Sequence, residues 1–195
     1  HATIRRQRQM CIRDSCPAGQ HDGDSDSSQA CIPCNLGKYG EGGNAQCIDC
    51  AAGQHDGDNN SGQACTACST GKYGAGGNAK CSDCAAGQYD DDRDSSTACR
   101  PCGTGTYSAT SALSCIDCVP GNYAAIGLDS TTAVNSAATH CIACPAGKYD
   151  DDVSPETVCV DCVPGNYAAI EDDLSLTTVS SAATHCIACP AGQHD

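Results

Sequence analysis

The chain has very few large apolar side chains. It contains no Trp and no Phe, a single Met, and only 21 Leu, Ile and Val among its 195 residues. A strongly charged chain of this kind cannot bury enough apolar surface to offset the conformational entropy that folding costs. A conventional domain built on one hydrophobic core is therefore excluded, and another source of stability is needed.

Long apolar runs and basic residues are also scarce. No run approaches the roughly 18 apolar residues of a membrane span, so none is expected in this sequence. Beyond Arg5, Arg6, Arg8 and Arg13, six Lys and Arg stand against 24 Asp and Glu. Such an acidic surface repels nucleic acid, so no nucleic-acid partner is expected. Catalysis needs a buried, oriented base, and because the chain offers little interior for one, we expect no enzyme.

Cysteine is abundant, with 20 residues in the chain. A cysteine content of about a tenth is typical of disulfide scaffolds in oxidising compartments. We therefore expect an extracellular or cell-surface protein. After Cys11 and Cys16 the cysteines form nine CxxC pairs. These are Cys31 and Cys34, Cys47 and Cys50, Cys65 and Cys68, Cys81 and Cys84, Cys99 and Cys102, Cys115 and Cys118, Cys141 and Cys144, Cys159 and Cys162, and Cys186 and Cys189.

One signature, C-x-x-G-x-[YH], follows Cys16 and the second cysteine of every pair, and it includes all seven tyrosines. The glycine predicts a tight turn with positive φ, and the aromatic residue predicts a short extended segment lying over a disulfide. The glycines are Gly19, Gly37, Gly53, Gly71, Gly87, Gly105, Gly121, Gly147, Gly165 and Gly192. The ring residues are His21, Tyr39, His55, Tyr73, Tyr89, Tyr107, Tyr123, Tyr149, Tyr167 and His194.

These repeats predict a small disulfide-rich repeat protein, an elongated solenoid-like rod of short β/turn modules with little regular secondary structure and no large hydrophobic core. Residues 1–15 form an irregular N-terminal segment, 16–117 hold modules with alternating 14- and 12-residue loops, and 118–195 hold modules with two long Ser/Thr-rich loops and an incomplete last module. No apolar period of 3.6 residues persists, which argues against helix. Each module is expected to contact only its two neighbours.

The sequence alone leaves the disulfide pairing open. A bond within one CxxC closes a small ring typical of redox sites, and two neighbouring CxxC pairs can also form a zinc site of four thiolates. A third arrangement joins the second cysteine of each pair to the first of the next, which leaves only Cys11 and Cys189. Because CPAGQHD occurs at 16–22 and again at 189–195, Cys189 is expected to open a further module.

The phrase C-P-x-G-x-Y, a polar loop and then C-x-x-C resembles the first half-module of tumour necrosis factor receptor cysteine-rich domains and ephrin-receptor-type repeats. The resemblance covers nearly the whole chain from Cys16 and implies a disulfide across each G-x-Y loop. Abundant Ala, Ser and Thr with CxxC periodicity is also similar to ciliate surface immobilization antigens and to the coat and fibre proteins of protists. The pairs implied are Cys16–Cys31, Cys34–Cys47, Cys50–Cys65, Cys68–Cys81, Cys84–Cys99, Cys102–Cys115, Cys118–Cys141, Cys144–Cys159 and Cys162–Cys186.

Several residues are candidate ligands or modification sites. Oxygen-bearing residues at alternate positions are typical of calcium loops, although the EF-hand glycine and glutamate are absent and a solvated acidic edge is the alternative. These candidates are Asp22, Asp24 and Asp26, and Asp56, Asp58 and Asn60. No other cofactor is expected. Asn59 is the single N-glycosylation acceptor, and the Ser and Thr of 129–139 and 175–184 suit O-linked sugars. His140 and His185, each directly before a CxxC, are interpreted as loop residues.

The favoured hypothesis is an extracellular structural glycoprotein, a surface antigen or coat component whose copies associate head to tail into a filament or appendage. The alternative is a receptor-like cysteine-rich ectodomain that binds a protein ligand. An exposed apolar patch across two or more modules favours the alternative.

Overall fold

The structure is a computed structural model, and it describes residues 16–23, 30–43, 46–57, 60–77, 80–170 and 182–190. Two compact units are present. Unit 1 comprises His1–Asp83 and Asp92–Ala98, and unit 2 comprises Cys84–Asp91 and Cys99–Asp195. Arg5, Arg6, Arg8, Cys11, Arg13, Asp24, Asp26, Asp58, Asn59, Gly192 and His194 lie outside the described residues.

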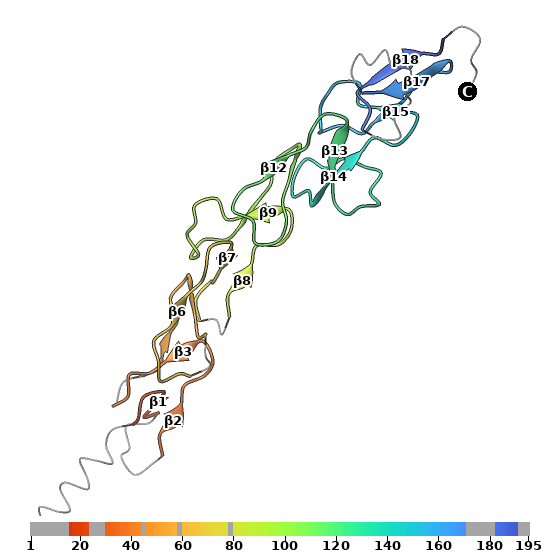
Figure 1. Ribbon diagram of the computed structural model, residues 1–195. Helices are drawn as coiled ribbons and strands as arrows, with labels where there is room; N and C mark the ends of the chain where they lie inside the picture. The colour runs from red at the N-terminus through yellow and green to blue at the C-terminus, as the bar shows by residue number, and fades with distance from the viewer. Residues whose placement is uncertain are drawn as a thin grey trace, which may run out of the picture. The chain divides into compact units, whose positions relative to one another are not determined.

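Every module is one antiparallel β-hairpin (Figure 1). Its first strand contains the ring residue of the G-x-[YH] signature. Its second strand contains the two residues that lie between the cysteines of the next CxxC pair. The strands are β1 (Gln20–His21), β2 (Ile32–Pro33), β3 (Lys38–Tyr39), β4 (Ile48–Asp49), β5 (Gln54–His55), β6 (Thr66–Ala67), β7 (Lys72–Tyr73), β8 (Ser82–Asp83), β9 (Gln88–Tyr89), β10 (Arg100–Pro101), β11 (Thr106–Tyr107), β12 (Ile116–Asp117), β13 (Asn122–Ala125), β14 (His140–Ala143), β15 (Lys148–Tyr149), β16 (Val160–Asp161), β17 (Asn166–Ala169) and β18 (His185–Ala188).

Nine disulfides each close one hairpin, and we number the modules 1 to 9 by these bonds in chain order. The pairing joins the second cysteine of each CxxC to the first of the next, with 13 to 24 residues of sequence separation. The bonds are Cys16–Cys31, Cys34–Cys47, Cys50–Cys65, Cys68–Cys81, Cys84–Cys99, Cys102–Cys115, Cys118–Cys141, Cys144–Cys159 and Cys162–Cys186.

The turn at each signature glycine brings the two strands into register. Gly19 has φ +83°, a backbone conformation that L side chains rarely adopt. Its carbonyl then accepts a hydrogen bond of 2.8 Å from the backbone N–H of Cys34. The same bond recurs at Cys50, Cys68, Cys102, Cys118, Cys144, Cys162 and Cys189.

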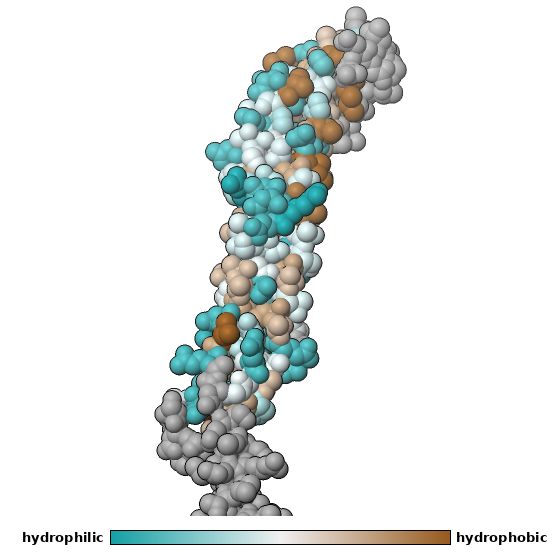
Figure 2. Space-filling model, turned by 90° about the vertical axis from the view of Figure 1, so that its left-hand side faces the viewer, coloured by the Kyte–Doolittle hydropathy of each residue, from teal (hydrophilic) through white to brown (hydrophobic). Residues whose placement is uncertain are grey.

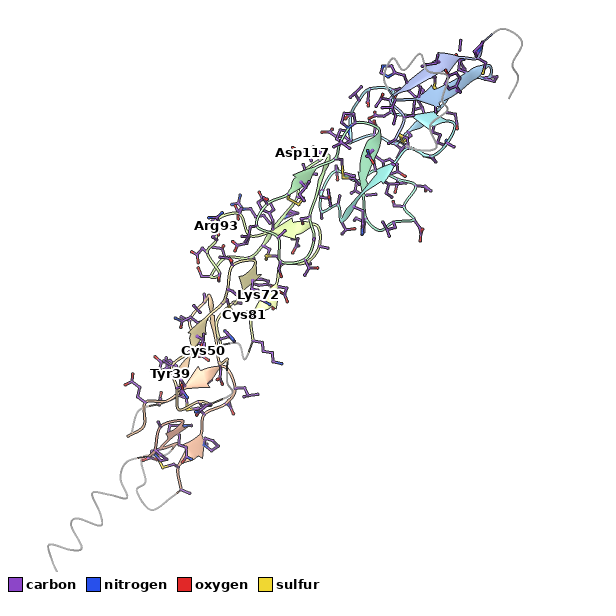
Figure 3. All side chains as sticks on the ribbon, viewed as in Figure 1. Tyr39, Cys50, Lys72, Cys81, Arg93 and Asp117 are labelled. Carbon is purple, nitrogen blue, oxygen red and sulfur yellow. A yellow bond between two sulfur atoms is a disulfide. The ribbon has the colours of Figure 1, made fainter. Side chains whose placement is uncertain are left out.

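Three hairpins each have an ion pair between a lysine of the first strand and an aspartate of the second. Lys38 lies opposite Asp49 in the β3–β4 ladder, with 2.9 Å between Nζ and Oδ1, and Lys72 pairs with Asp83 at 2.7 Å (Figure 3). Lys148 and Asp161 repeat the arrangement. Because these side chains are exposed, each pair contributes roughly 0.2–1 kcal/mol and does not explain the fold.

Sulfur and methyl groups make up most of the apolar interior, beside the buried polar residues Asp56, Asp90, Ser108 and Asp150. Among the described residues, the buried apolar ones are eight cysteines, six alanines and Tyr123, whose hydroxyl donates to the Ser130 carbonyl at 2.9 Å. One apolar cluster joins Cys118, Ala124 and Ala138, with Tyr107 and Val134 beside it. This composition confirms the prediction of a disulfide-rich repeat of β/turn modules without a large hydrophobic core. The described residues include no helix, and therefore none that could cross a bilayer.

Candidate functional site: the junction between modules

Successive modules are joined by backbone hydrogen bonds that recur at the same positions. The residue directly after each ring residue donates its N–H to a loop carbonyl of the next module, at 2.8 to 3.3 Å, at six junctions. The pairs are Gly40 to Ser61, Gly74 to Ser95, Asp90 to Ala112, Ser108 to Ala138, Ala124 to Pro155 and Asp150 to Ala183. These donors are buried, so the interaction is part of the interior.

A second set of bonds ends on the first cysteine of seven modules. Its carbonyl accepts from the loop of the next module, through either a backbone N–H or a serine hydroxyl. The N–H donors all have positive φ and are Gly43, Gly77, Ser111, Ala137 and Ala182, bonded to Cys16, Cys50, Cys84, Cys102 and Cys144. The hydroxyl donors are Ser61 and Ser95, bonded to Cys34 and Cys68 at 3.2 and 3.1 Å. In these seven modules the first cysteine thus provides an acceptor for the following module.

Modules also contact their second neighbours, so the prediction of contacts between adjacent modules alone is wrong. A Cβ at Gly19 of module 1 would lie 2.8 Å from the backbone N of Gly62 in module 3. At Gly87 of module 5 it would overlap the carbonyl oxygen of Ala137 in module 7. Gly53 and Gly121 meet the loop backbone of modules 5 and 9 in the same way, whereas Gly105 meets the Pro155 ring of module 8. The turn glycine allows this approach because no side chain separates the two backbones.

The turn glycines of modules 8 and 9 have no such neighbour among the described residues. Gly147 and Gly165 have the same positive φ, yet a Cβ at either position would meet no described residue within 4 Å. A side chain at either position would therefore add backbone strain without a clash inside the described part of the chain.

Three buried aspartates follow ring residues, and the carboxylate of one of them bonds across a junction. Asp56, Asp90 and Asp150 directly follow the ring residue and are buried. One carboxylate oxygen of Asp150 accepts the N–H of Gly121 in module 7 at 3.0 Å, and the other accepts the Ser154 N–H at 3.1 Å. Asp150 thereby joins the turn of one module to the loop of the next.

Replacing Asp150 by Ala is expected to loosen this junction. The change leaves the Gly121 N–H without its acceptor, which costs about 1–3 kcal/mol when such a group is buried, whereas the Ser154 N–H keeps its bond to Asp152. Amide hydrogen exchange should therefore become at least about tenfold faster at Gly121. Asp150→Asn keeps one carbonyl acceptor and should show a smaller effect. Unchanged exchange at Gly121 in Asp150→Ala would contradict the role of this carboxylate.

The acidic loops that are described form self-contained turns. Asp152 accepts from the Thr157 hydroxyl at 2.9 Å and from the Ser154 N–H at 3.0 Å. The Thr157 hydroxyl, a donor to the ionised form, lowers the pKa of the Asp152 carboxyl below its ordinary value. The Ser96 hydroxyl, and then the Ser96 N–H, likewise lower the pKa of Asp94.

Of the calcium candidates, Asp22, Asp56 and Asn60 are described. Asp22 is half-buried beside His21, and Asn60 accepts the Gly62 N–H at 3.1 Å. Asp56 is buried, and its Oδ2 has no hydrogen-bond partner among the described residues. Calcium binding stays a prediction, because Asp24, Asp26 and Asp58 lie outside the described residues.

The remaining candidates lie in the hairpins. His140 and His185 open β14 and β18, so they are strand residues and not the loop residues of our interpretation. Each has its Nδ1 within hydrogen-bond distance of the hydroxyl of the preceding threonine, at 2.8 and 2.9 Å. Cys189 is half-buried and has a free thiol. Its N–H bonds to the Gly165 carbonyl, so it occupies the same position as the second cysteine of other CxxC pairs.

No protein-family model matches the chain, and no curated protein sequence matches it either. The functional proposal therefore rests on the repeat geometry. Disulfide bonding on this scale is typical of extracellular proteins.

Proposed function

We propose that the chain is a non-catalytic extracellular structural protein whose copies associate head to tail to build a cell-surface coat, appendage or filament. The repeated junction between modules carries this proposal. At Gly19, Gly53 and Gly87 the turn glycine receives a loop two modules further on, so the same contact recurs along the described chain. A second copy supplies loops of the same kind, and a heterologous contact between unlike ends generates an open assembly.

The chemistry of the exterior supports the same role. Disulfides suit an oxidising exterior, and Asn59 and the Ser/Thr-rich loops would carry the sugars of a surface glycoprotein. The resemblance to ciliate surface immobilization antigens and to protist coat and fibre proteins agrees with this proposal.

The assembly can be tested with purified, oxidised chain by sedimentation velocity and electron microscopy over a range of concentrations. We expect the wild type to form progressively longer assemblies. The Gly147→Ala, Gly165→Ala double variant should remain monomeric, because its two methyl groups fill the faces that receive the next copy. Gly103→Ala is the control, since Gly103 has ordinary φ and open space around its Cβ position. Monomeric wild type at every concentration, or equal assembly of both variants, would refute the proposal.

A receptor-like ectodomain is the second candidate, and exposed apolar residues in unit 2 favour it. Val119 and Val163 are each 65% exposed, and Ile126 and Ile170 are 58% and 47% exposed. They occupy matching positions in the two CVPGNYAAI segments of modules 7 and 9. On the face that Figure 2 displays, brown apolar side chains are more frequent in unit 2 than in unit 1. Side chains of this kind suit a protein ligand that spans more than one module.

A further inference from the structure

Two histidines of unit 1 lie against the disulfide of the following module. His21 Nδ1 lies 3.0 Å from Cys47 Sγ, and His55 Nδ1 lies 3.1 Å from Cys81 Sγ. In each case the imidazole nitrogen and both sulfurs of the bond lie within 4.8 Å of one another. The sulfur partners are Cys34, which is buried in module 2, and Cys68, which is buried in module 4. Cys81 is labelled in Figure 3.

The histidine is not required by the repeat. His21 and His55 each stand 13 positions before the first cysteine of the next disulfide, and Tyr89 has the same spacing before Cys102–Cys115. Cys34–Cys47, Cys68–Cys81 and Cys102–Cys115 share a sequence separation of 13. The disulfides that follow His21 and His55 thus differ from the disulfide that follows Tyr89 in having a nitrogen donor available beside the sulfurs.

A cavity gives access to the first of these clusters. Its volume is about 320 Å³, and its lining includes His21, Cys47, Asp22, Asn35 and Lys38. Cys47 and His21 are both half-buried, so a small reagent reaches them from solvent. The strongly acidic chain also raises the local concentration of cations.

We propose that reduction converts each cluster into a binding site for a thiophilic d10 cation such as Zn²⁺, held by two thiolates and one imidazole. The sites consist of His21, Cys34 and Cys47, and of His55, Cys68 and Cys81. Two molecules of a low-molecular-weight thiol supply the two electrons and two protons, which gives two cysteine thiols and one small-molecule disulfide. Zn²⁺ then displaces both thiol protons and forms two Zn–S bonds and one Zn–N bond.

The observed separations suit this conversion. Zn–S bonds of about 2.3 Å and a Zn–N bond of about 2.0 Å at tetrahedral angles place the nitrogen about 3.5 Å from each sulfur and the sulfurs about 3.8 Å apart. The Cα atoms of the two pairs are 5.6 and 5.8 Å apart, so the side chains can open to these distances while the hairpin stays closed. Three protein donors leave the fourth position to water, as in other zinc sites with two cysteine ligands and one histidine ligand.

The ring proton must move when the metal binds. A disulfide sulfur has no hydrogen, so the imidazole N–H is the donor to it in the oxidised chain, and His55 Nδ1 also donates to the Thr66 carbonyl at 3.0 Å. Coordination through Nδ1 places the proton on Nε2. The Thr66 bond is exchanged for a bond to the metal, and the ring needs no large displacement because it already faces the sulfurs.

The test uses the whole chain with Zn²⁺ and a limiting amount of a small thiol. An acid quench strips the metal and stops exchange, and labelling of free thiols followed by peptide mapping then reports which disulfides have opened. We expect Zn²⁺ at ten times its Kd to raise the opened fraction of Cys34–Cys47 and Cys68–Cys81 about tenfold over Cys102–Cys115. A parallel sample, desalted without acid, should retain one zinc ion for each of these two disulfides that has opened.

The ring position of the signature is occupied by either His or Tyr in this chain, so exchanging the two residues provides matched controls. The His21→Tyr, His55→Tyr double variant should lose both zinc ions and open its disulfides no more readily than Cys102–Cys115. Tyr89→His should add a third zinc ion and make Cys102–Cys115 responsive to Zn²⁺. Equal opening of the three pairs with Zn²⁺, or zinc retention unchanged by the histidine substitutions, would overturn the proposal.

Discussion

Gly87→Ala is expected to open the contact between modules 5 and 7 and to make the amides of Ser108 and Ala137 exchange at least about 30-fold faster. Gly87 has φ +83°, so the new side chain costs about 1–2 kcal/mol in backbone strain. Its Cβ also overlaps the Ala137 carbonyl, and displacing packed backbone costs a further 1–3 kcal/mol or so. The N–H groups of Ser108 and Ala137 donate to the carbonyls of Ala138 and Cys102. Because both bonds involve the loop that Gly87 contacts, the exchange rates of these amides report the loss of that contact.

Gly147→Ala separates the cost of backbone strain from the cost of displacing packed backbone. Gly147 has φ +76° but no described residue within 4 Å of its Cβ position, so the dilute, monomeric variant should show the strain alone. The difference between the two variants then measures the second-neighbour contact. If Gly87→Ala and Gly147→Ala speed exchange in their own modules equally, the contact between modules 5 and 7 contributes nothing to stability.

Complete reduction with a chelator present is expected to abolish every hairpin. Each bond closes a loop of 13 to 24 residues and constrains the unfolded chain by about 3 kcal/mol, so nine bonds contribute roughly 25 kcal/mol. That sum exceeds the roughly 5–15 kcal/mol net stability of an ordinary domain, and the buried alanines and one tyrosine cannot replace it. Circular dichroism and amide exchange should both report an unfolded chain.

The control for this experiment is reoxidation after removal of the reductant, which should restore the protected amides of Cys34, Cys68 and Cys102. The chelator prevents a metal from taking over the role of the sulfur bonds. Amides that stay protected in the reduced and chelated chain would show that packing alone specifies the fold.

The module itself could be predicted from the sequence because cysteine, glycine and the ring residue each have one structural role in it. Cysteine spacing sets the loops, and a glycine at a fixed distance before a ring residue marks the turn, as at Gly19 and His21. The strand formed by residues between two cysteines, such as Ile32 and Pro33, could not be predicted, since a CxxC by itself has no strand pattern.

The junctions could not be predicted because they are made largely by backbone groups. The donors after the ring residue include Gly40, Asp90 and Ala124, which share burial but no chemistry. Ala137 and Ala182 adopt positive φ in places where a glycine would have been the visible signal. The proximity of His21 to Cys47 spans 26 residues and depends on how one module docks on the next.

The order of the disulfides decides how the protein responds to a pulling force. Tension entering at Cys16 crosses to Cys31 through sulfur, passes along two residues to Cys34, and crosses again to Cys47. The shortest covalent path therefore bypasses every loop, so the loops carry no load and the chain is nearly inextensible. Cleaving Cys34–Cys47 alone would let the bypassed loop extend and lengthen the chain by about 40 Å under tension.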